Sequence, residues 1–511
     1  MSFMLKYGFS VGVFFLSVVL PAEQPQQPAR PPRSMQIALG QRQLFLDDFM
    51  LGDIYQIDRV IHQPIKYAGN PIIRADLPTD GTSIELREAP IWDERAKLWK
   101  IWYFRTDERG ADQPGGGSGF AQSKDGLSWE KPNLGLVENR GSRNNNIVLV
   151  KGEPAAFTQH VIIDPNASSL ASRYKGMIGP HDRRPMISAD GFVFTPLPVP
   201  AIPSDDESHL FWDVLQKKYV MTVKHNGPFG RSVYLTLSKD FEIWSDPILI
   251  YHADLLDQQL GEKHIRAIEA DPRMWRPTIN EPKEYNTEIY NMPIFVYEGL
   301  YIGLPLYFES SGRVPLPIGN QDGTNSVKLT CSRDLRSWTR VGDRTHFIPI
   351  SPLGKGQIDT GQVVPSSHPI KMGNELWFYY SGLDVRYRPD TAEKRGKYLG
   401  AIHLAKLRLD GFVSMHANHE GGFLDTRPLN LDAERLFVNA AVKGELRAEI
   451  VERSGRKTLP GWGFTDCTPI VGDHLKIELR WSGRTLRELQ GKDIVVRFHL
   501  KDADLFSFWL E

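Results

Sequence analysis

Two glutamates stand in strand-like segments that are far apart in the chain and lack turn residues to account for them. Glu88 lies between Arg87 and Ala89-Pro90, and Glu288 lies in the polar start of an apolar segment, Asn286–Asn291. Cleavage of a glycosidic bond needs one carboxyl group that donates a proton and one that is ionised. Burial and crowding of like charges can hold two carboxyl groups in these different states. We interpret Glu288 as the proton donor and Glu88 as the base or nucleophile.

Other polar residues occupy similar positions and are candidates for supporting roles. Asp206 or Asp359 would be a third carboxylate that orients a substrate or tunes the acid. Each of these carboxylates can be interpreted more simply as a surface or turn residue. One aspartate of the pair Asp47-Asp48 can be interpreted as a turn cap, and His225 as a structural histidine. The candidate substrate-binding residues are Asp47, Asp48, Arg87, His160, Asp164, Lys224 and His225.

A repeated motif indicates the elements that would position these residues. Ser123-Lys124-Asp125-Gly126-Leu127-Ser128-Trp129 has the same Ser-x-Asp-x-x-x-Trp spacing as the segments that begin at Ser238 and Ser332, and the segment at Ser188 has Phe in place of Trp. The aspartate is expected to accept bonds from backbone N–H groups one or two residues on, and the aromatic residue to open the next strand and face a neighbouring unit. Leu409-Asp410-Gly411-Phe412-Val413 keeps only the turn.

Such hairpins bury both faces when they stack around an axis, which predicts an all-β fold with a five-bladed β-propeller. Segment 254–270 is the best candidate for a helix. From about residue 421 the pattern changes to period-two strands with short turns, which predicts a C-terminal β-sandwich. The expected organisation is a signal peptide (1–22), a disordered linker (23–40), the propeller (41–418) and the sandwich (419–511). The candidate carboxylates would converge where the innermost strands of the blades meet.

Composition narrows the class of protein. The 511 residues carry a formal net charge of −1, which does not indicate a nucleic-acid partner. The presence of only two cysteines, Cys331 and Cys467, excludes a disulfide framework. We expect two buried unpaired thiols, and a single bridge between them is the alternative. Lys6 and the apolar run that follows it resemble a secretory signal, so the mature protein is expected to be secreted or periplasmic, without a membrane anchor. An uncleaved N-terminal anchor is the alternative.

The turn motif, the segment Leu44–Asp48 and the closing Leu505-Phe506-Ser507-Phe508 resemble secreted bacterial proteins with domains of the glycoside hydrolase family 32 type. Families 43 and 130 share the five-bladed propeller. The resemblance spans about residues 40 to 511 and implies a carbohydrate substrate. The family 32 motifs Asn-Asp-Pro-Asn-Gly, Arg-Asp-Pro and Glu-Cys are not present in full, and Asp164-Pro165 matches the second one only in part, so a fructoside specificity does not follow.

Three functions remain open at this point. The first is a glycoside hydrolase that works with paired carboxylates and no organic cofactor. The second is a propeller that binds carbohydrate without cleaving it. The third is a phosphorolytic enzyme of the family 130 type, in which Arg87 and Lys224 would have to converge on a phosphate. No metal-ligand spacing is evident in the sequence, so no metal is expected in the site; a structural cation on the propeller axis and the oligomeric state are left open.

Overall fold

The computed structural model of the protein describes residues 34–106, 117–274, 279–313, 316, 319–384 and 400–511. The expected signal peptide and most of the expected linker lie outside these residues. Among the described helices, none is long and apolar enough to cross a membrane.

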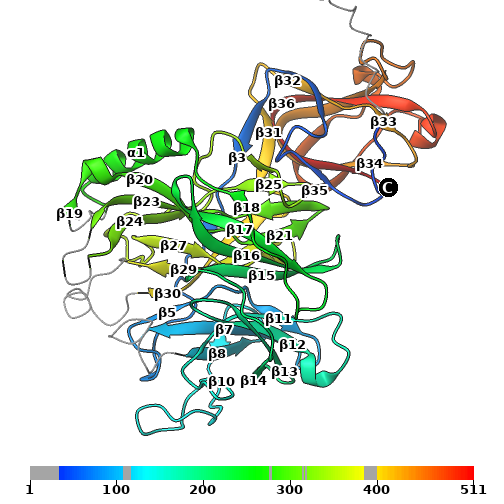
Figure 1. Ribbon diagram of the computed structural model, residues 1–511. Helices are drawn as coiled ribbons and strands as arrows, with labels where there is room; N and C mark the ends of the chain where they lie inside the picture. Colours follow the sequence, from blue (N-terminus) through cyan, green and yellow to red (C-terminus); the bar gives the residue numbers. More distant parts are fainter. Residues whose placement is uncertain (1–33, 107–116, 275–278, 314–315, 317–318, 385–399) are drawn as a thin grey trace, which may run out of the picture.

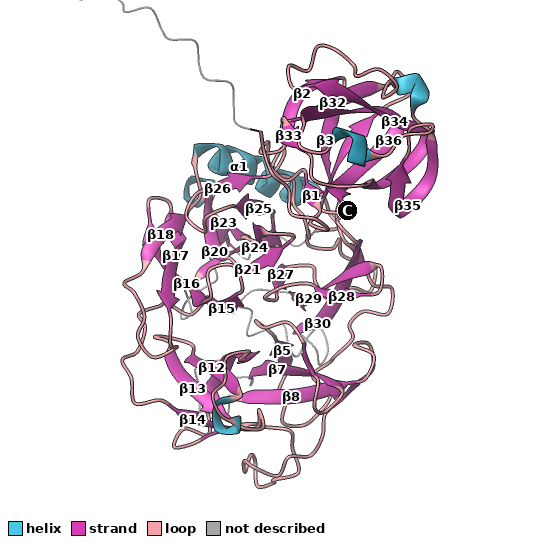
Figure 2. Ribbon diagram, turned by 90° about the vertical axis from the view of Figure 1, so that its right-hand side faces the viewer, coloured by secondary structure: helices cyan, strands magenta, loops and turns pink. Residues whose placement is uncertain are grey.

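The protein is built almost entirely from β-strands, which confirms the predicted all-β class. Curled, mainly antiparallel sheets lie around a common centre and form the propeller body, and one further sheet lies beside it (Figures 1 and 2). The body contains one long path of strands and three separate sheets. The number of blades stays a prediction.

The strands of the body alternate with short turns, as the sequence pattern indicates. The long path runs through β19 (Ile279–Asn280), β23 (Leu306–Arg313), β24 (Gln321–Val327), β27 (Gln362–Pro365), β29 (Glu375–Leu383), β30 (Gly400–Arg408), β5 (Ser83–Glu85), β7 (Leu98–Thr106), β8 (Ser118–Ser123) and β9 (Trp129–Glu130), with β20 (Asn286–Asn291), β28 (Ile370–Met372), β4 (Ile65–Lys66) and β6 (Ile91–Asp93) as branches. The first separate sheet contains β10 (Leu149–Val150), β14 (Val193–Pro196), β13 (Arg184–Ser188), β12 (Tyr174–Gly179) and β11 (Phe157–Ile163). The second contains β15 (Ser208–Asp213), β16 (Lys218–Gly227), β17 (Gly230–Ser238) and β18 (Ile248–Tyr251). The third contains β21 (Ile294–Tyr297), β22 (Leu300–Gly303), β25 (Thr330–Ser332) and β26 (Trp338–Arg340).

Short parallel pairings join neighbouring units of the long path. Asn325 of β24 pairs with Gln362 of β27, and Gly400 of β30 pairs with Ser83 of β5. All other pairings along this path are antiparallel. The path therefore consists of antiparallel hairpin units that touch one another side by side.

The four copies of the Ser-x-Asp turn have the same hydrogen bonds. In the first copy, the Asp125 carboxylate accepts from the N–H groups of Leu127 at 2.8 Å and Ser128 at 2.7 Å, and the Ser123 hydroxyl donates to the same carboxylate at 3.0 Å. The copies at residues 188, 238 and 332 repeat this pattern. The prediction of an aspartate-capped turn is confirmed, with the bonds two and three residues on rather than one or two.

The aromatic residue that follows the first turn contacts another unit, as predicted. The ring of Trp129 lies edge-on to Tyr379 of β29 at a centroid distance of 6.2 Å, and its indole N–H donates to the carbonyl oxygen of Gly126 at 3.0 Å. The same carbonyl oxygen accepts from the Tyr379 hydroxyl at 2.7 Å. The turn thus fixes the contact between two hairpin units of the long path that are remote in sequence.

The predicted helix is confirmed as α1 (Leu255–Ala270). Asp254 caps its first turn by accepting from the N–H of Asp257, whose side chain accepts from the N–H of Asp254 in return. The helix packs closely on β20, because a Cβ atom added at Gly261 would lie 1.9 Å from Oγ1 of Thr287. Figure 1 shows α1 along the edge of the body, over β20 and β23.

The sheet beside the body combines strands from both ends of the described chain and is called the terminal sheet below. It consists of β1 (Gln43–Leu44), β2 (Leu51–Tyr55), β3 (Asp58–Ile61), β31 (Val413–Ala417), β32 (Gly422–Thr426), β33 (Leu429–Asn430), β34 (Leu436–Glu452), β35 (Ile470–Leu479) and β36 (Asp493–Leu510). It therefore takes strands from both sides of the predicted boundary at residue 418. The sandwich arrangement itself stays a prediction.

Asp410 holds this sheet to the body. Its buried carboxylate accepts from Arg42, from the hydroxyl groups of Tyr297 and Ser507 at 2.7 Å each, and from the Asn439 amide at 3.0 Å. The fifth, partial copy of the turn motif therefore joins this sheet to the propeller body. The two cysteines are free and buried, as expected.

Candidate active site

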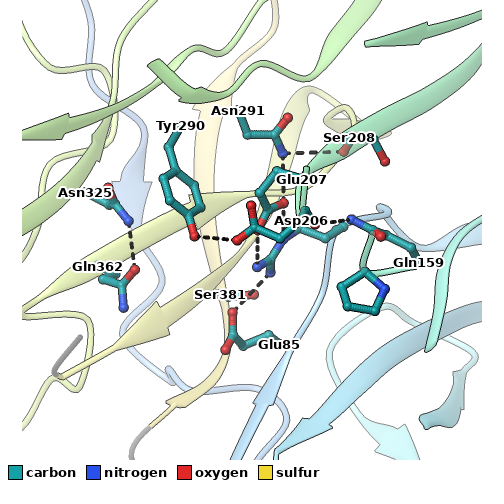
Figure 3. A network of polar contacts seen from close by, with 12 residues as sticks. Glu85, Gln159, Asp206, Glu207, Ser208, Tyr290, Asn291, Asn325, Gln362 and Ser381 are labelled. Carbon is teal, nitrogen blue, oxygen red and sulfur yellow. Dashed lines mark hydrogen bonds and ion pairs between the residues drawn. The ribbon is translucent and has the colours of Figure 1, made fainter. Parts of the chain in front are cut away.

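Polar side chains from four units meet at the centre of the body (Figure 3). They come from β5 and the residues after it, from β11, from the residues before β15, and from β20. The main members of this central network are Glu85, Arg87, Gln159, Asp206, Glu207, Tyr290 and Asn291. The predicted convergence of carboxylates from separate units is present here, for part of the predicted set.

Asp206 is the most exposed carboxylate of this network, with 39 % of its side chain exposed against 16 % for Glu85 and 4 % for Glu207. It is paired with Lys224, and the Tyr290 hydroxyl donates to it at 3.0 Å. Burial by itself would raise the pKa of Asp206, but the charge of Lys224 and the hydrogen bonds from Lys224 and Tyr290 outweigh it and lower that pKa to about 2. Asp206 is therefore ionised at any physiological pH.

Glu88 has the opposite environment. Its side chain is only 4 % exposed, and burial raises its pKa well above the ordinary value, against the smaller effect of hydrogen bonds from Ser367 and the N–H of Ala89. His160 Nδ1 lies 3.5 Å from its Oε2, and His368 Nδ1 lies 3.9 Å from its Oε1. Burial also lowers the pKa of both histidines, so neither supplies a positive charge that would hold Glu88 ionised. Glu88 therefore keeps its proton to a higher pH than an ordinary glutamate does.

Consecutive residues of β11 contact the main chain of Asp206 and the carboxyl group of Glu88. Gln159 donates from Nε2 to the backbone oxygen of Asp206 at 3.1 Å, and the next residue, His160, lies beside Glu88. The pairing of β11 with β12 shifts between Thr158 and His160, which is a bulge. A bulge changes the direction of the side chains that follow it. This local irregularity lets two consecutive residues reach the Asp206 main chain and the Glu88 carboxyl group.

Arg87 and Glu207 form the buried core of the network. Arg87 donates to both oxygens of Glu207 at 2.7–3.1 Å and to Glu85 at 3.1 Å, and these carboxylates raise its pKa against the opposing effect of burial. The amide of Asn291 donates to Glu207 at 3.4 Å. We did not predict roles for Glu85 and Glu207. The sequence feature that could have indicated them is their position close to the predicted residues Arg87, Glu88 and Asp206, in Glu85-Leu86-Arg87-Glu88 and Asp205-Asp206-Glu207.

Glu288 lies at the edge of this network. It is paired with Arg231 of β17, and Asn286 donates to its Oε1 at 2.9 Å; its side chain is 6 % exposed. The Arg231 guanidinium lies over the rings of Tyr290 and Phe308 at 5.5 and 5.4 Å. Glu88 and Glu288 thus have different sets of partners, and Tyr290 lies between Glu288 and Asp206 along this chain of contacts.

The other predicted residues lie in separate places. Asp359 accepts from Lys66 at 2.6 Å and from Tyr380 at 2.9 Å, and Asp164 pairs with Lys175 at 3.0 Å and accepts from Tyr219 at 2.8 Å. His225 lies against the ring of Tyr234. Asp47 pairs with Arg333 and Asp48 with Arg59, in the turn between β1 and β2 beside the terminal sheet.

Uncharged amides complete the central region. Asn325 Nδ2 donates to Gln362 Oε1 at 2.7 Å, while the buried Oδ1 of Asn325 has no hydrogen-bond partner within the described residues. An amide group offers both donors and acceptors in one plane. Together with the carboxylates and the Tyr290 hydroxyl, these groups suit a ligand that carries many hydroxyl groups.

Comparisons with known proteins give similarity in structure only. No protein-family model and no curated protein sequence matches the chain. Among solved structures, a protein described as a glycoside hydrolase is 14 % identical with a TM-score of 0.40, over 68 % of this chain and 92 % of that one. An N-acetylgalactosamine deacetylase from F. plautii, in complex with blood group B trisaccharide, is 12 % identical with a TM-score of 0.40 over 70 % and 97 %. A fructofuranosidase from Schwanniomyces occidentalis, complexed with fructosylnystose, is 11 % identical with a TM-score of 0.37 over 88 % and 98 %.

Proposed function

We propose that the protein is a glycoside hydrolase that cleaves a glycosidic bond of an oligosaccharide or polysaccharide at the central network. The observation that carries this proposal is the opposite shift of two carboxyl pKa values: burial raises the pKa of Glu88, whereas Lys224 and Tyr290 lower the pKa of Asp206 and keep it ionised. A proton donor and an ionised carboxylate are the two groups that this reaction requires.

In this proposal the roles differ from those expected from sequence. Glu88 gives its proton to the leaving-group oxygen, and Asp206 acts as base or nucleophile on the other side of the bond. Lys224 and Tyr290 hold Asp206 in place. Glu288, held by Arg231, and the amides of Asn291, Asn325 and Gln362 bind hydroxyl groups of the substrate.

The test is hydrolysis of a panel of plant, algal and microbial glycans, measured as release of reducing ends. We expect Glu88→Gln and Asp206→Asn each to lower kcat by at least about 100-fold, which is the lower range for loss of a general acid or base. Asp53→Asn is a matched control, because Asp53 is exposed on β2 in the terminal sheet. Wild-type activity in either of the first two variants would exclude that residue from the assigned role.

A binding function without hydrolysis is the second candidate. Two observations favour it. Asp206, Glu207 and Glu288 form ion pairs with lysine or arginine side chains, and the side chain of Glu88 is only slightly exposed. In that case glycans would bind to wild-type protein, as measured by calorimetry, without release of reducing ends.

Phosphorolysis is a third candidate. The network and its edge contain the cationic side chains of Arg87, Lys224 and Arg231. Arg183 lies next to the network, where its guanidinium group donates to the Ser208 hydroxyl. Repeating the panel with inorganic phosphate decides this point, because a phosphorylase would form a sugar phosphate and would be nearly inactive without phosphate.

A further inference from the structure

Three side chains with metal-binding atoms meet on the other side of the sheet that carries Glu288. They are His264 of α1, Glu309 of β23 and His346 of the loop after β26, and their ligand atoms all lie within 4.8 Å of one another. The imidazole rings of the two histidines have a centroid distance of 4.4 Å. The three residues come from separate stretches, so no local spacing in the sequence indicates them.

The two oxygens of Glu309 point to different histidines. His264 Nδ1 contacts Oε2, and His346 Nε2 lies 3.5 Å from Oε1. Glu309 is 1 % exposed, and neither its Oε1 nor the Nε2 of His346 has a hydrogen-bond partner within the described residues. A buried polar atom without a partner carries a free-energy cost, because it has lost its hydrogen bonds to water. An ion bound between these atoms would remove that cost.

The cluster lies away from the central network. In the pairing of β20 with β23, Thr287 is opposite Glu309 and Glu288 is opposite Phe308. Successive residues of a strand point to opposite faces, so Glu309 faces α1 while Glu288 faces Arg231. A ligand at this cluster would therefore contact none of the residues assigned to hydrolysis.

We propose that His264, Glu309 and His346 bind one divalent transition-metal ion, with Zn²⁺ as the preferred ion. Two imidazoles and one carboxylate are a donor set that Zn²⁺ accepts, whereas Ca²⁺ and Mg²⁺ favour oxygen ligands only. The side chain of His264 is 27 % exposed, which leaves an entry path and room for a water molecule as the fourth ligand. The bound ion joins α1 and the loop around His346 to β23.

Metal binding by the chelator-treated, untagged full-length chain tests this proposal. Elemental analysis after dialysis against Zn²⁺ is expected to give one ion per chain, and calorimetric titration a single strong site. His264→Gln and His346→Gln are expected to weaken binding at least tenfold. His181→Gln is the matched control, since His181 is exposed and lies outside the cluster.

A second readout separates metal ligation from a general effect on folding. Co²⁺ added to the apo protein is expected to give the visible absorption of a four-coordinate ion, and Zn²⁺ to raise the Tm of wild type and His181→Gln but not of the cluster variants. Absence of Zn²⁺ and Co²⁺ binding by wild type would overturn the proposal and leave a hydrogen-bonded His-Glu-His cluster. Equal binding by all variants would overturn it as well, by placing the ion elsewhere.

Discussion

The ammonium group of Lys224 forms an ion pair with the Asp206 carboxylate and lies 3.9 Å from the centre of the Tyr290 ring. Burial lowers the pKa of Lys224, and Asp206 counteracts that effect, so the two groups keep each other charged. Because Lys224 is 4 % exposed, its charge acts on Asp206 with little screening by water.

The first prediction concerns Lys224→Met. Without the ammonium group, burial of Asp206 is less well opposed, and we expect its pKa to rise from about 2 to near or above the ordinary ~3.9. The acid limb of the kcat/KM profile would then move up by about two pH units. The measurement is the pH–rate profile on whichever glycan the wild type hydrolyses. An unchanged acid limb would show that Asp206 is not the ionised group in the reaction.

The second prediction concerns stability and Glu88. Because burial raises the pKa of Glu88, the folded protein holds a proton that the unfolded chain releases above about pH 4.3. The wild type therefore loses stability as pH rises from about 5 toward the pKa of the folded state. Glu88→Gln removes this dependence, so the variant is expected to gain stability relative to wild type with rising pH. Tm values at several pH values measure this, and parallel curves would contradict it.

The third prediction concerns the contact between α1 and β20. Gly→Ala inside a helix normally stabilises by about 1 kcal/mol, but at Gly261 the new Cβ would lie 1.9 Å from Thr287 Oγ1. We expect Gly261→Ala to destabilise by about 1–3 kcal/mol. Adding Thr287→Ala should recover part of that loss, which a double-mutant cycle in urea measures. Simple additivity of the two changes would show that the helix sits further from the sheet.

The fourth prediction concerns the repeated turn. Asp125→Ala removes the acceptor for two backbone N–H groups and is expected to cost about 1–2 kcal/mol. Lys124→Ala is the control in the same turn, because Lys124 is exposed, and its effect should be within about 0.5 kcal/mol. Midpoints of urea unfolding give both values. Similar effects of the two substitutions would mean that the turn does not depend on its aspartate.

The fifth prediction concerns Asp410, whose carboxylate accepts four hydrogen bonds. Asp410→Ala leaves buried donors without a partner, and we expect a loss of about 3–5 kcal/mol. Asp473→Ala is the control, because Asp473 is 70 % exposed in its pair with Arg408 and is expected to change stability by less than about 1 kcal/mol. Tm values compare the two variants, and an equal, small effect would contradict the assigned role of Asp410.

Local features could be predicted from the sequence because they depend on neighbouring residues. The turn at Asp125 and the helix after Asp254 need only nearby donors and caps, and both are present in the structure. The pairing of β1 with β36 could not be predicted, since nothing in the short segment Gln43–Leu44 identifies a partner at the other end of the chain.

The site was predictable in part for the same reason. Placing Glu88, Arg87 and Asp206 near the centre required only the repeat and the expected convergence of its innermost strands. The sequence favours Glu88 as the base or nucleophile, whereas the proposal from the structure makes it the proton donor. The roles differ because the pKa values of Glu88 and Asp206 depend on burial and on Lys224, which approaches only in the folded protein. The cluster of His264, Glu309 and His346 was missed because its members come from a helix, a strand and a loop.

The partnership between β1 and β36 has a consequence for synthesis. Gln43 is aligned with Phe508 and Leu44 with Ser507, so the earliest strand of the described chain cannot pair with its neighbour until residues 507 and 508 have been made. The body strands on the long path, which end at Arg408, are all made before β36, so the propeller body can begin to assemble before the terminal sheet closes.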